Sequence, residues 1–274
     1  MLFQSKISLE NLIIGYLAQY SNKSAHEIFE HLKMAKHPYT LQGVYKELKK
    51  LDREGVILKV DKKHSLRLSW ALEYTALARS IEESYLSPQY VALLPKANKK
   101  EIWRFDNLFK LNDLWAQLLL VLAEQSKDKI ICGWNPHTWF HLAEAKEEEK
   151  YIQSLERLGV KLYLFIGGNH YLDVWAEKYL KKEHINYSYA KTSFQEERSK
   201  YYNVVDDYIL TVKLDQDTTD RIEALYEKTL SQEEMNIAEI MSIFNRKVKA
   251  SLWLERDPSK AELYRKRFAR EFGI

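Results

Sequence analysis

The sequence predicts a chain of mixed fold class, α+β and α/β, in two parts. The first part is a small domain of three helices and a β-hairpin; the second is a larger α/β domain, with a mostly parallel sheet and helices on both faces. Apolar residues recur at helical spacing in three capped segments before residue 54. From residue 129 onward, short apolar runs alternate with helical segments, the pattern of a sheet covered on both faces.

The first two helices are predicted from their caps. Ser8 precedes a segment over 8–20 whose apolar residues follow the i, i+3, i+4, i+7 spacing of an amphipathic helix. Ser24 and Glu27 form a capping box for the second helix. This helix must end before Pro38, because proline does not fit a helix interior.

Thr40 is expected to cap a third helix that ends at Gly55. Its predicted buried stripe consists of Leu41, Val44, Leu48 and Leu51. Alternating residues over 56–60 and 65–70 predict two strands of a hairpin, joined by a turn over 61–64.

Basic residues are concentrated in the N-terminal part. Residues 1–70 hold 12 Lys and Arg against 7 Asp and Glu, a net charge of +5. Residues 71–274 hold 30 against 32, a net charge of −2. A basic patch confined to one small domain indicates nucleic-acid binding, although charge alone is equally compatible with a solvated surface cluster.

The element order of 1–70, and above all TLQGVYKELKKLDREG followed by VILKV, resembles a winged helix-turn-helix. The resemblance implies that the third helix enters the major groove of double-stranded DNA and that the hairpin contacts the backbone or the minor groove. The candidate DNA-binding residues are Thr40, Gln42, Tyr45, Lys46, Lys49, Lys50, Lys59, Lys62, Lys63, His64 and Arg67. The alternative is a winged helix that holds a protein partner.

The remaining elements are predicted from the spacing of apolar residues and from residues that end helices and strands. We expect a connecting helix and linker over 71–104, with a strand over 90–94 and an exposed segment over 96–101, and an α/β domain over 105–274. Within that domain we expect helices over 105–125, 141–158, 171–182, 217–229, 232–244 and after 257, and strands over 129–134, 160–166, 185–189, 201–214 (two strands) and 249–255.

The runs KIICGW, VKLYLFIGGN and YYNVVDDYILTVKL resemble a phospholipase-D-like domain, the effector half of TrmB-type regulators. The enzymes of that family carry His-x-Lys-x-x-x-x-Asp before a final hairpin. Placing Asp206 at the aspartate leaves Ser199 and Tyr201 at the histidine and lysine positions. The resemblance therefore implies a domain without catalytic activity.

Polar residues after two predicted strands suggest a ligand site, since open α/β sheets bind ligands at strand carboxyl ends. The candidate ligand-binding residues are Trp134, Asn135, His137, Gly167, Gly168, Asn169 and Asp206. The alternative is tight turns and core aromatics. His137 and His141 have the i, i+4 spacing of helix-borne metal ligands, but there is no H-E-x-x-H, and we expect neither a metal nor a cofactor.

These observations predict a transcriptional regulator that binds double-stranded DNA as a homodimer, with a small molecule as the candidate effector. We expect it to be cytoplasmic, because the most apolar stretch, 118–123, is too short to span a bilayer. The alternatives are an antitoxin-like or scaffold protein and a phospholipase-D-like nuclease or phosphotransferase.

Overall fold

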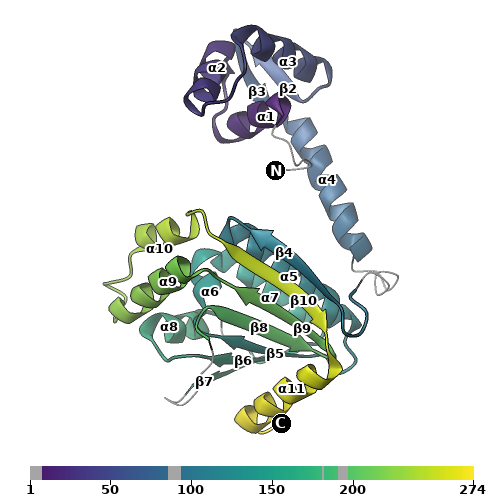
Figure 1. Cartoon of the computed structure of the whole chain (residues 1–274), viewed down its shortest axis with the longest axis vertical. Coiled ribbons are helices and arrows are strands. Elements are labelled where there is room, and N and C mark those ends of the chain that lie inside the picture. Colours follow the sequence, from purple (N-terminus) through teal and green to yellow (C-terminus); the bar gives the residue numbers. More distant parts are fainter. Residues whose placement is uncertain (1–7, 86–93, 181, 191–196) are drawn as a thin grey trace. The chain divides into compact units, whose positions relative to one another are not determined.

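The computed structural model describes residues 8–85, 94–180, 182–190 and 197–274, and the chain divides into two compact units (Figure 1). The N-terminal unit is Met1–Ser84 and the C-terminal unit is Tyr85–Ile274. The strand predicted over 90–94 lies outside the described residues, except for its last position.

The N-terminal unit contains the predicted helices and hairpin. Its elements are α1 (Leu9–Gln19), β1 (Lys23–Ser24), α2 (Ala25–Met34), α3 (Leu41–Arg53), β2 (Ile57–Val60), β3 (Lys63–Leu66) and α4 (Leu68–Tyr85). The caps are confirmed: Ser8 accepts from the backbone N–H of Asn11, Thr40 accepts from that of Gly43, and Ser24 and Glu27 form a capping box. The two-residue strand β1, which was not predicted, pairs with β3 in a sheet of order β1-β3-β2.

The hairpin is tighter than predicted. Asp61 and Lys62 both have positive φ, 49° and 66°, as a two-residue type I′ turn requires, and Val60 pairs with Lys63. The second strand therefore begins two residues earlier than expected and ends at Leu66, and α4 begins at Leu68. The strand predicted over 65–70 is wrong beyond Leu66 because the turn residues set the register.

The C-terminal unit is built around a seven-stranded sheet of order β4-β10-β9-β8-β5-β6-β7. Its strands are β4 (Lys100–Phe105), β5 (Ile130–Asn135), β6 (Lys161–Ile166), β7 (Ile185–Tyr189), β8 (Lys200–Val205), β9 (Tyr208–Lys213) and β10 (Ala250–Arg256). Its helices are α5 (Leu108–Gln125), α6 (Trp139–Ala143), α7 (Ala145–Arg157), α8 (Tyr171–Leu180), α9 (Gln216–Lys228), α10 (Ile237–Phe244) and α11 (Pro258–Phe272).

The α/β class is confirmed, but the expectation of a mostly parallel sheet is wrong. Only the pairs β5–β6 and β6–β7 are parallel, and the other four pairs are antiparallel. The hairpin β8–β9 has a turn at Asp206 and Asp207, which makes those neighbours antiparallel. Because β8 also pairs antiparallel with β5, only the edge β5-β6-β7 keeps the parallel arrangement.

Helices cover the two faces unequally. Residues of α5 to α10 pack on one face with Ile131, Leu162 and Leu164, whereas α11 covers the other face (Figure 1). Alternate strand residues, such as Cys132 and Tyr163, point toward α11. Both faces are buried, which explains the nearly continuous apolar runs of β5 and β6.

The segment 96–101 is exposed, as predicted, and its last two residues begin the edge strand β4. Two local predictions need correction. The helix predicted over 141–158 is two helices, broken at Glu144 with φ −135° and ψ 43°. The helix predicted over 232–244 begins only at Ile237, after its Asn236 cap. Among the described helices, none is both long and apolar enough to cross a bilayer.

Candidate functional site

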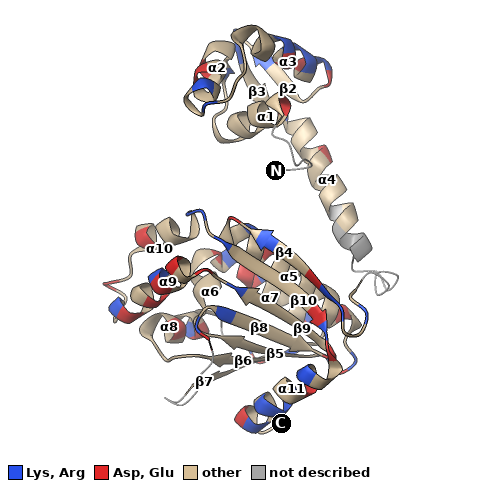
Figure 2. Ribbon diagram, viewed as in Figure 1, with Lys and Arg blue, Asp and Glu red and all other residues tan. Residues whose placement is uncertain are grey.

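Helix α3 separates a buried apolar side from an exposed polar side. Val44, Leu48 and Leu51 are at most 2% exposed and pack against α1, α2 and β2. The helix is 13 residues long, or about 20 Å, which suits the major groove. Gln42, Tyr45, Lys46 and Lys49 are all exposed at i, i+3, i+4 and i+7 on the other side. Figure 2 shows Lys and Arg gathered along this helix.

The basic residues of this region fall into two groups. Among the described residues, no carboxylate lies within 4.0 Å of the amino group of Lys46, Lys49, Lys59, Lys62 or Lys63. Lys50 differs, because its amino group pairs with Glu10 at 2.7 Å and Glu47 at 3.1 Å, and these contacts raise its pKa. Lys50 is therefore already neutralised within the unit.

Two predicted DNA-contact residues of the β2–β3 hairpin region, which we call the wing, make contacts within the N-terminal unit. His64 is 6% exposed, and burial lowers its pKa below the ordinary value of 6.5. Arg67 donates to the Ile57 carbonyl at 2.7 Å and pairs with Asp52 of α3 at 3.5 Å. His64 thus packs in the unit, while Arg67 fastens the hairpin to α3. Thr40 uses its hydroxyl oxygen to cap α3, although its exposed O–H remains able to donate.

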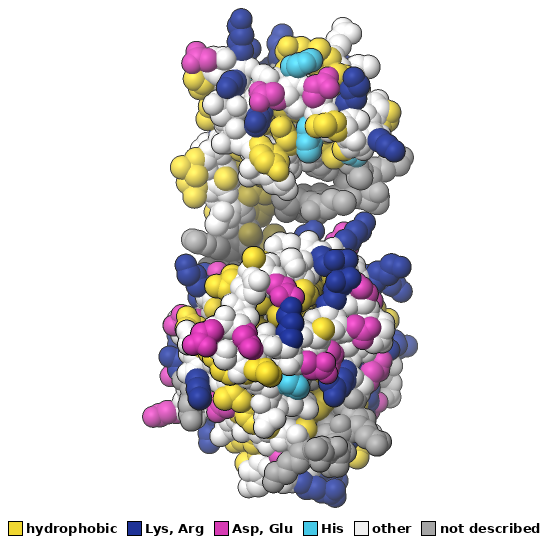
Figure 3. All heavy atoms as spheres, turned by 90° about the vertical axis from the view of Figure 1, so that its left-hand side faces the viewer, with side chains coloured by type: hydrophobic (Ala, Val, Ile, Leu, Met, Phe, Trp, Pro, Cys, Tyr) yellow, Lys and Arg dark blue, Asp and Glu magenta, His cyan; other side chains and the backbone are white. Residues whose placement is uncertain are grey.

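We define the basic face as the five predicted contact lysines that are exposed and meet no carboxylate, together with two exposed predicted contact residues of α3. It consists of Gln42, Tyr45, Lys46, Lys49, Lys59, Lys62 and Lys63. Over the side of the C-terminal unit seen in Figure 3, acidic and basic side chains are interspersed.

In the C-terminal unit, the predicted ligand residues lie partly together. The Gly167 N–H donates to the Asn135 carbonyl at 2.8 Å, so the loops that follow β5 and β6 are in contact. A Cβ on Gly167 would lie 2.9 Å from the Pro136 backbone, so this close approach requires glycine. Asn135 and His137 are buried, Gly168 is half-buried and Asn169 is exposed.

The other two predicted ligand residues differ in position. The Trp134 ring is on the α11 face, packed edge-on to Phe165, and it borders Gly167, where a Cβ would lie 3.3 Å from its Cη2 atom. Asn135, by contrast, lines a cavity on the opposite face. Asp206 is at the other end of the sheet, because β8 runs antiparallel to β5 and its turn lies beside the start of β5. Asp206 accepts hydrogen bonds from the Ser126 hydroxyl and the Lys127 N–H. Spacing along the chain could not reveal the strand direction that places Asp206 away from the other predicted ligand residues.

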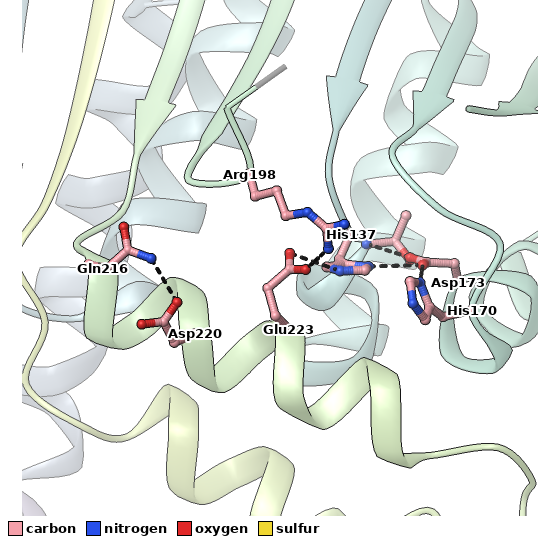
Figure 4. Close-up of polar contacts among 8 residues, drawn as sticks. His137, His170, Asp173, Arg198, Gln216, Asp220 and Glu223 are labelled. Atoms are coloured by element: carbon pink, nitrogen blue, oxygen red, sulfur yellow. Dashed lines mark hydrogen bonds and ion pairs between the residues drawn. The ribbon is translucent and has the colours of Figure 1, made fainter. Parts of the chain in front are cut away.

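His137 is the centre of a buried polar cluster (Figure 4). Its Nδ1 lies 3.0 Å from Asp173 Oδ2, and its Nε2 lies 3.1 Å from Glu223 Oε1. Glu223 also pairs with Arg198, which directly precedes the buried Ser199. The imidazole stacks on Tyr226 with a centroid distance of 4.0 Å.

Sequence reasoning missed Asp173, His170 and Glu223. Burial alone would raise the pKa of Asp173, but His137, His170 and the Thr138 N–H, all beside its carboxylate, hold it below its ordinary value. The spacing of His170 and Asp173, one turn apart where a helix was predicted to start, is a signal that the sequence contained. Glu223 comes from α9, far along the chain, and had no local signal.

His141 does not join this cluster, because His137 precedes α6 and is not on it. His141 instead pairs with the buried Glu148 at 3.3 Å beside a cavity of about 40 Å³. Asn112 donates to Glu148 and Glu144, and burial raises the pKa of Glu144 to about 7. The cavity is large enough for a few water molecules.

Comparisons with known proteins found distant structural neighbours. No protein-family model and no curated protein matches the chain. The chain is similar to TrmBL2, an archaeal chromatin protein whose structure shows a novel mode of DNA binding, with a TM-score of 0.36 and 11% identity over 98% of this chain and 94% of that one.

Two further neighbours cover less of the chain. Nuc, a phospholipase D family member from Salmonella typhimurium, has a TM-score of 0.38 and 9% identity over 64% of this chain and 95% of that one. NucT from Helicobacter pylori has a TM-score of 0.36 and 10% identity over 64% and 97%. With TM-scores below 0.5, these neighbours indicate nothing about function.

Proposed function

We propose that the chain is a sequence-specific transcriptional regulator that binds double-stranded DNA through the basic face of its N-terminal unit. The observation that carries the proposal is that this face presents five lysines that no described carboxylate neutralises, on and beside a helix whose opposite side is buried. Helix α3 would lie in the major groove, where Gln42 can bond adenine in bidentate fashion. The wing lysines would contact phosphates.

The C-terminal unit is proposed to be non-catalytic and to serve dimerisation or ligand sensing. Ser199 and Tyr201 stand where the resembling enzymes have histidine and lysine, and they are 6% and 1% exposed. A tyrosine whose hydroxyl is buried, with a pKa raised by that burial, suits neither proton transfer nor phosphate binding.

Helix α4 is proposed to pack against α4 of a second copy. Trp70, Tyr74, Leu77 and Ile81 follow the 4-3-4 spacing of a coiled-coil seam, and the last three are 38%, 52% and 46% exposed. We expect light scattering to give a dimer for the wild type and a weakened dimer for Leu77→Glu. A monomeric wild type, or a Leu77→Glu dimer of unchanged affinity, would remove α4 from the interface.

Selection of genomic fragments by the purified full-length chain tests the DNA proposal. We expect enrichment of a shared motif, and loss of binding for Lys46→Glu and Lys63→Glu. Lys178→Glu is the matched control, since it changes the net charge equally at an exposed site on α8. Unchanged affinity of both Lys46→Glu and Lys63→Glu for DNA would refute the proposal. Absence of DNA binding by the wild type would favour a protein-binding winged helix.

A further inference from the structure

We propose that the C-terminal unit binds one divalent transition-metal ion, of the class represented by Zn²⁺ and Co²⁺, through His137, His170 and Asp173. These residues come from the loop after β5, the loop after β6 and the first turn of α8. One ligand atom from each lies within 4.8 Å of the others. Two imidazoles and one carboxylate are a known donor set for Zn²⁺, with the fourth position open to water or substrate.

The spacing of the donor atoms fits a tetrahedral ion. Metal–ligand bonds of about 2.0–2.1 Å place tetrahedral ligands about 3.3 Å apart. Asp173 Oδ2 lies 3.0 Å from Nδ1 of His137 and 3.7 Å from Nδ1 of His170, so the two distances bracket this value. The two histidine nitrogens lie within 4.8 Å of each other, so the imidazoles would close on the ion as it binds.

The groups around these donors hold them in a metal-binding orientation. The N–H and hydroxyl of Thr138 donate to Asp173 Oδ1 at 3.0 and 3.1 Å, which leaves Oδ2 directed at the histidines. Glu223 faces Nε2 of His137 at 3.1 Å, and Arg198 holds Glu223 in turn (Figure 4). A carboxylate on the far nitrogen of a ligating histidine fixes its tautomer and increases its basicity.

His170 distinguishes a metal site from a simple ion pair. A protonated His137 between two carboxylates would account for the contacts of His137 without any metal. It would not account for His170 Nδ1, a buried atom with no hydrogen-bond partner among the described residues. Its 3.7 Å separation from Asp173 is too long for a hydrogen bond. A bound cation would satisfy this nitrogen and offset the charges of Asp173 and Glu223.

The surroundings of His170 also provide access. Its side chain is 31% exposed, so an ion can reach the cluster from solvent. Its position depends on Gly168, because a Cβ there would lie 2.7 Å from His170 Nδ1. The glycine pair after β6 therefore makes room for a histidine as well as for the approach to Pro136.

Metal titration of the full-length chain tests the proposal independently of DNA binding. The chain is purified without a histidine tag, treated with chelator, and titrated with Co²⁺ by visible absorption and with Zn²⁺ by calorimetry. We expect one ion per chain with the intense visible bands of tetrahedral Co²⁺. His170→Ala should weaken binding by about 100-fold and Glu223→Gln by about 10-fold. His184→Ala, in the loop before β7, should leave it unchanged.

Circular dichroism of each variant shows whether the fold is retained, and the partly exposed His170 makes its variant the decisive one. Wild type without saturable binding would overturn the proposal. Equal losses in His184→Ala and His170→Ala would also overturn it, since they would indicate binding that is not specific to the proposed residues.

Discussion

The salt dependence of DNA binding follows from the five lysines of the basic face. Each phosphate that a lysine neutralises adds about −0.9 to the slope of log K against log salt. Five contacts give about −4.5 for each N-terminal unit bound, so a fourfold rise in salt would weaken binding by about 500-fold. Two units on one duplex would double the slope.

Single substitutions then divide the lysines into two classes. Lys46→Ala should lower the slope by about a fifth, because it removes one of the five proposed contacts. Lys50→Ala should leave the slope unchanged, because Glu10 and Glu47 already neutralise this amino group. Fluorescence anisotropy of a labelled duplex over a salt series measures both. Equal slopes for wild type and Lys46→Ala, or equal losses in the two variants, would refute the division.

Three further predictions concern the folded units. Leu48→Ala should destabilise the N-terminal unit by about 2–5 kcal/mol in urea, whereas Leu68→Ala, 73% exposed in the wild type, should cost less than about 0.5 kcal/mol; similar costs would contradict the assigned core. Burial raises the pKa of the Cys132 thiol to about 12, so a thiol reagent at mildly alkaline pH should react only after unfolding, and rapid native labelling would contradict this. Burial, then the charge of Lys59, lowers the pKa of His64 below 6.5. The folded unit therefore binds fewer protons than the unfolded chain. The free energy of unfolding should be highest above pH 6.5 and should decrease as the pH falls below that value. His64→Gln should flatten that decline in urea unfolding, and an unchanged pH dependence would argue against it.

Local structure was predictable where a few neighbouring residues decide it. Ser8, Ser24 and Thr40 cap helices as expected, because capping requires only the backbone N–H groups of the next turn. The stripe through Val44 and Leu48 is buried as its spacing predicted. The register of the hairpin turn was harder to predict, because it depends on positive φ at Asp61 and Lys62.

Long-range relations were not predictable from one sequence. Strand direction comes from the route of the chain between strands, so the antiparallel β8 and the edge strand β4 could not be read from apolar runs. The same limit applies to sites. The sequence identified His137 and the loop after β6, but Asp206 lies at the far end of the sheet and Glu223 arrives from α9.

Direct cross-linking to DNA tests the central claim, that the exposed side of α3 touches the duplex. A photoreactive phenylalanine analogue is placed at Tyr45, which is 56% exposed on α3, or at Tyr179, which is 58% exposed on α8. The account predicts cross-links to a selected duplex from position 45 and none above background from position 179. Efficient cross-linking from 179, with none from 45 in a chain that still binds the duplex, would contradict it.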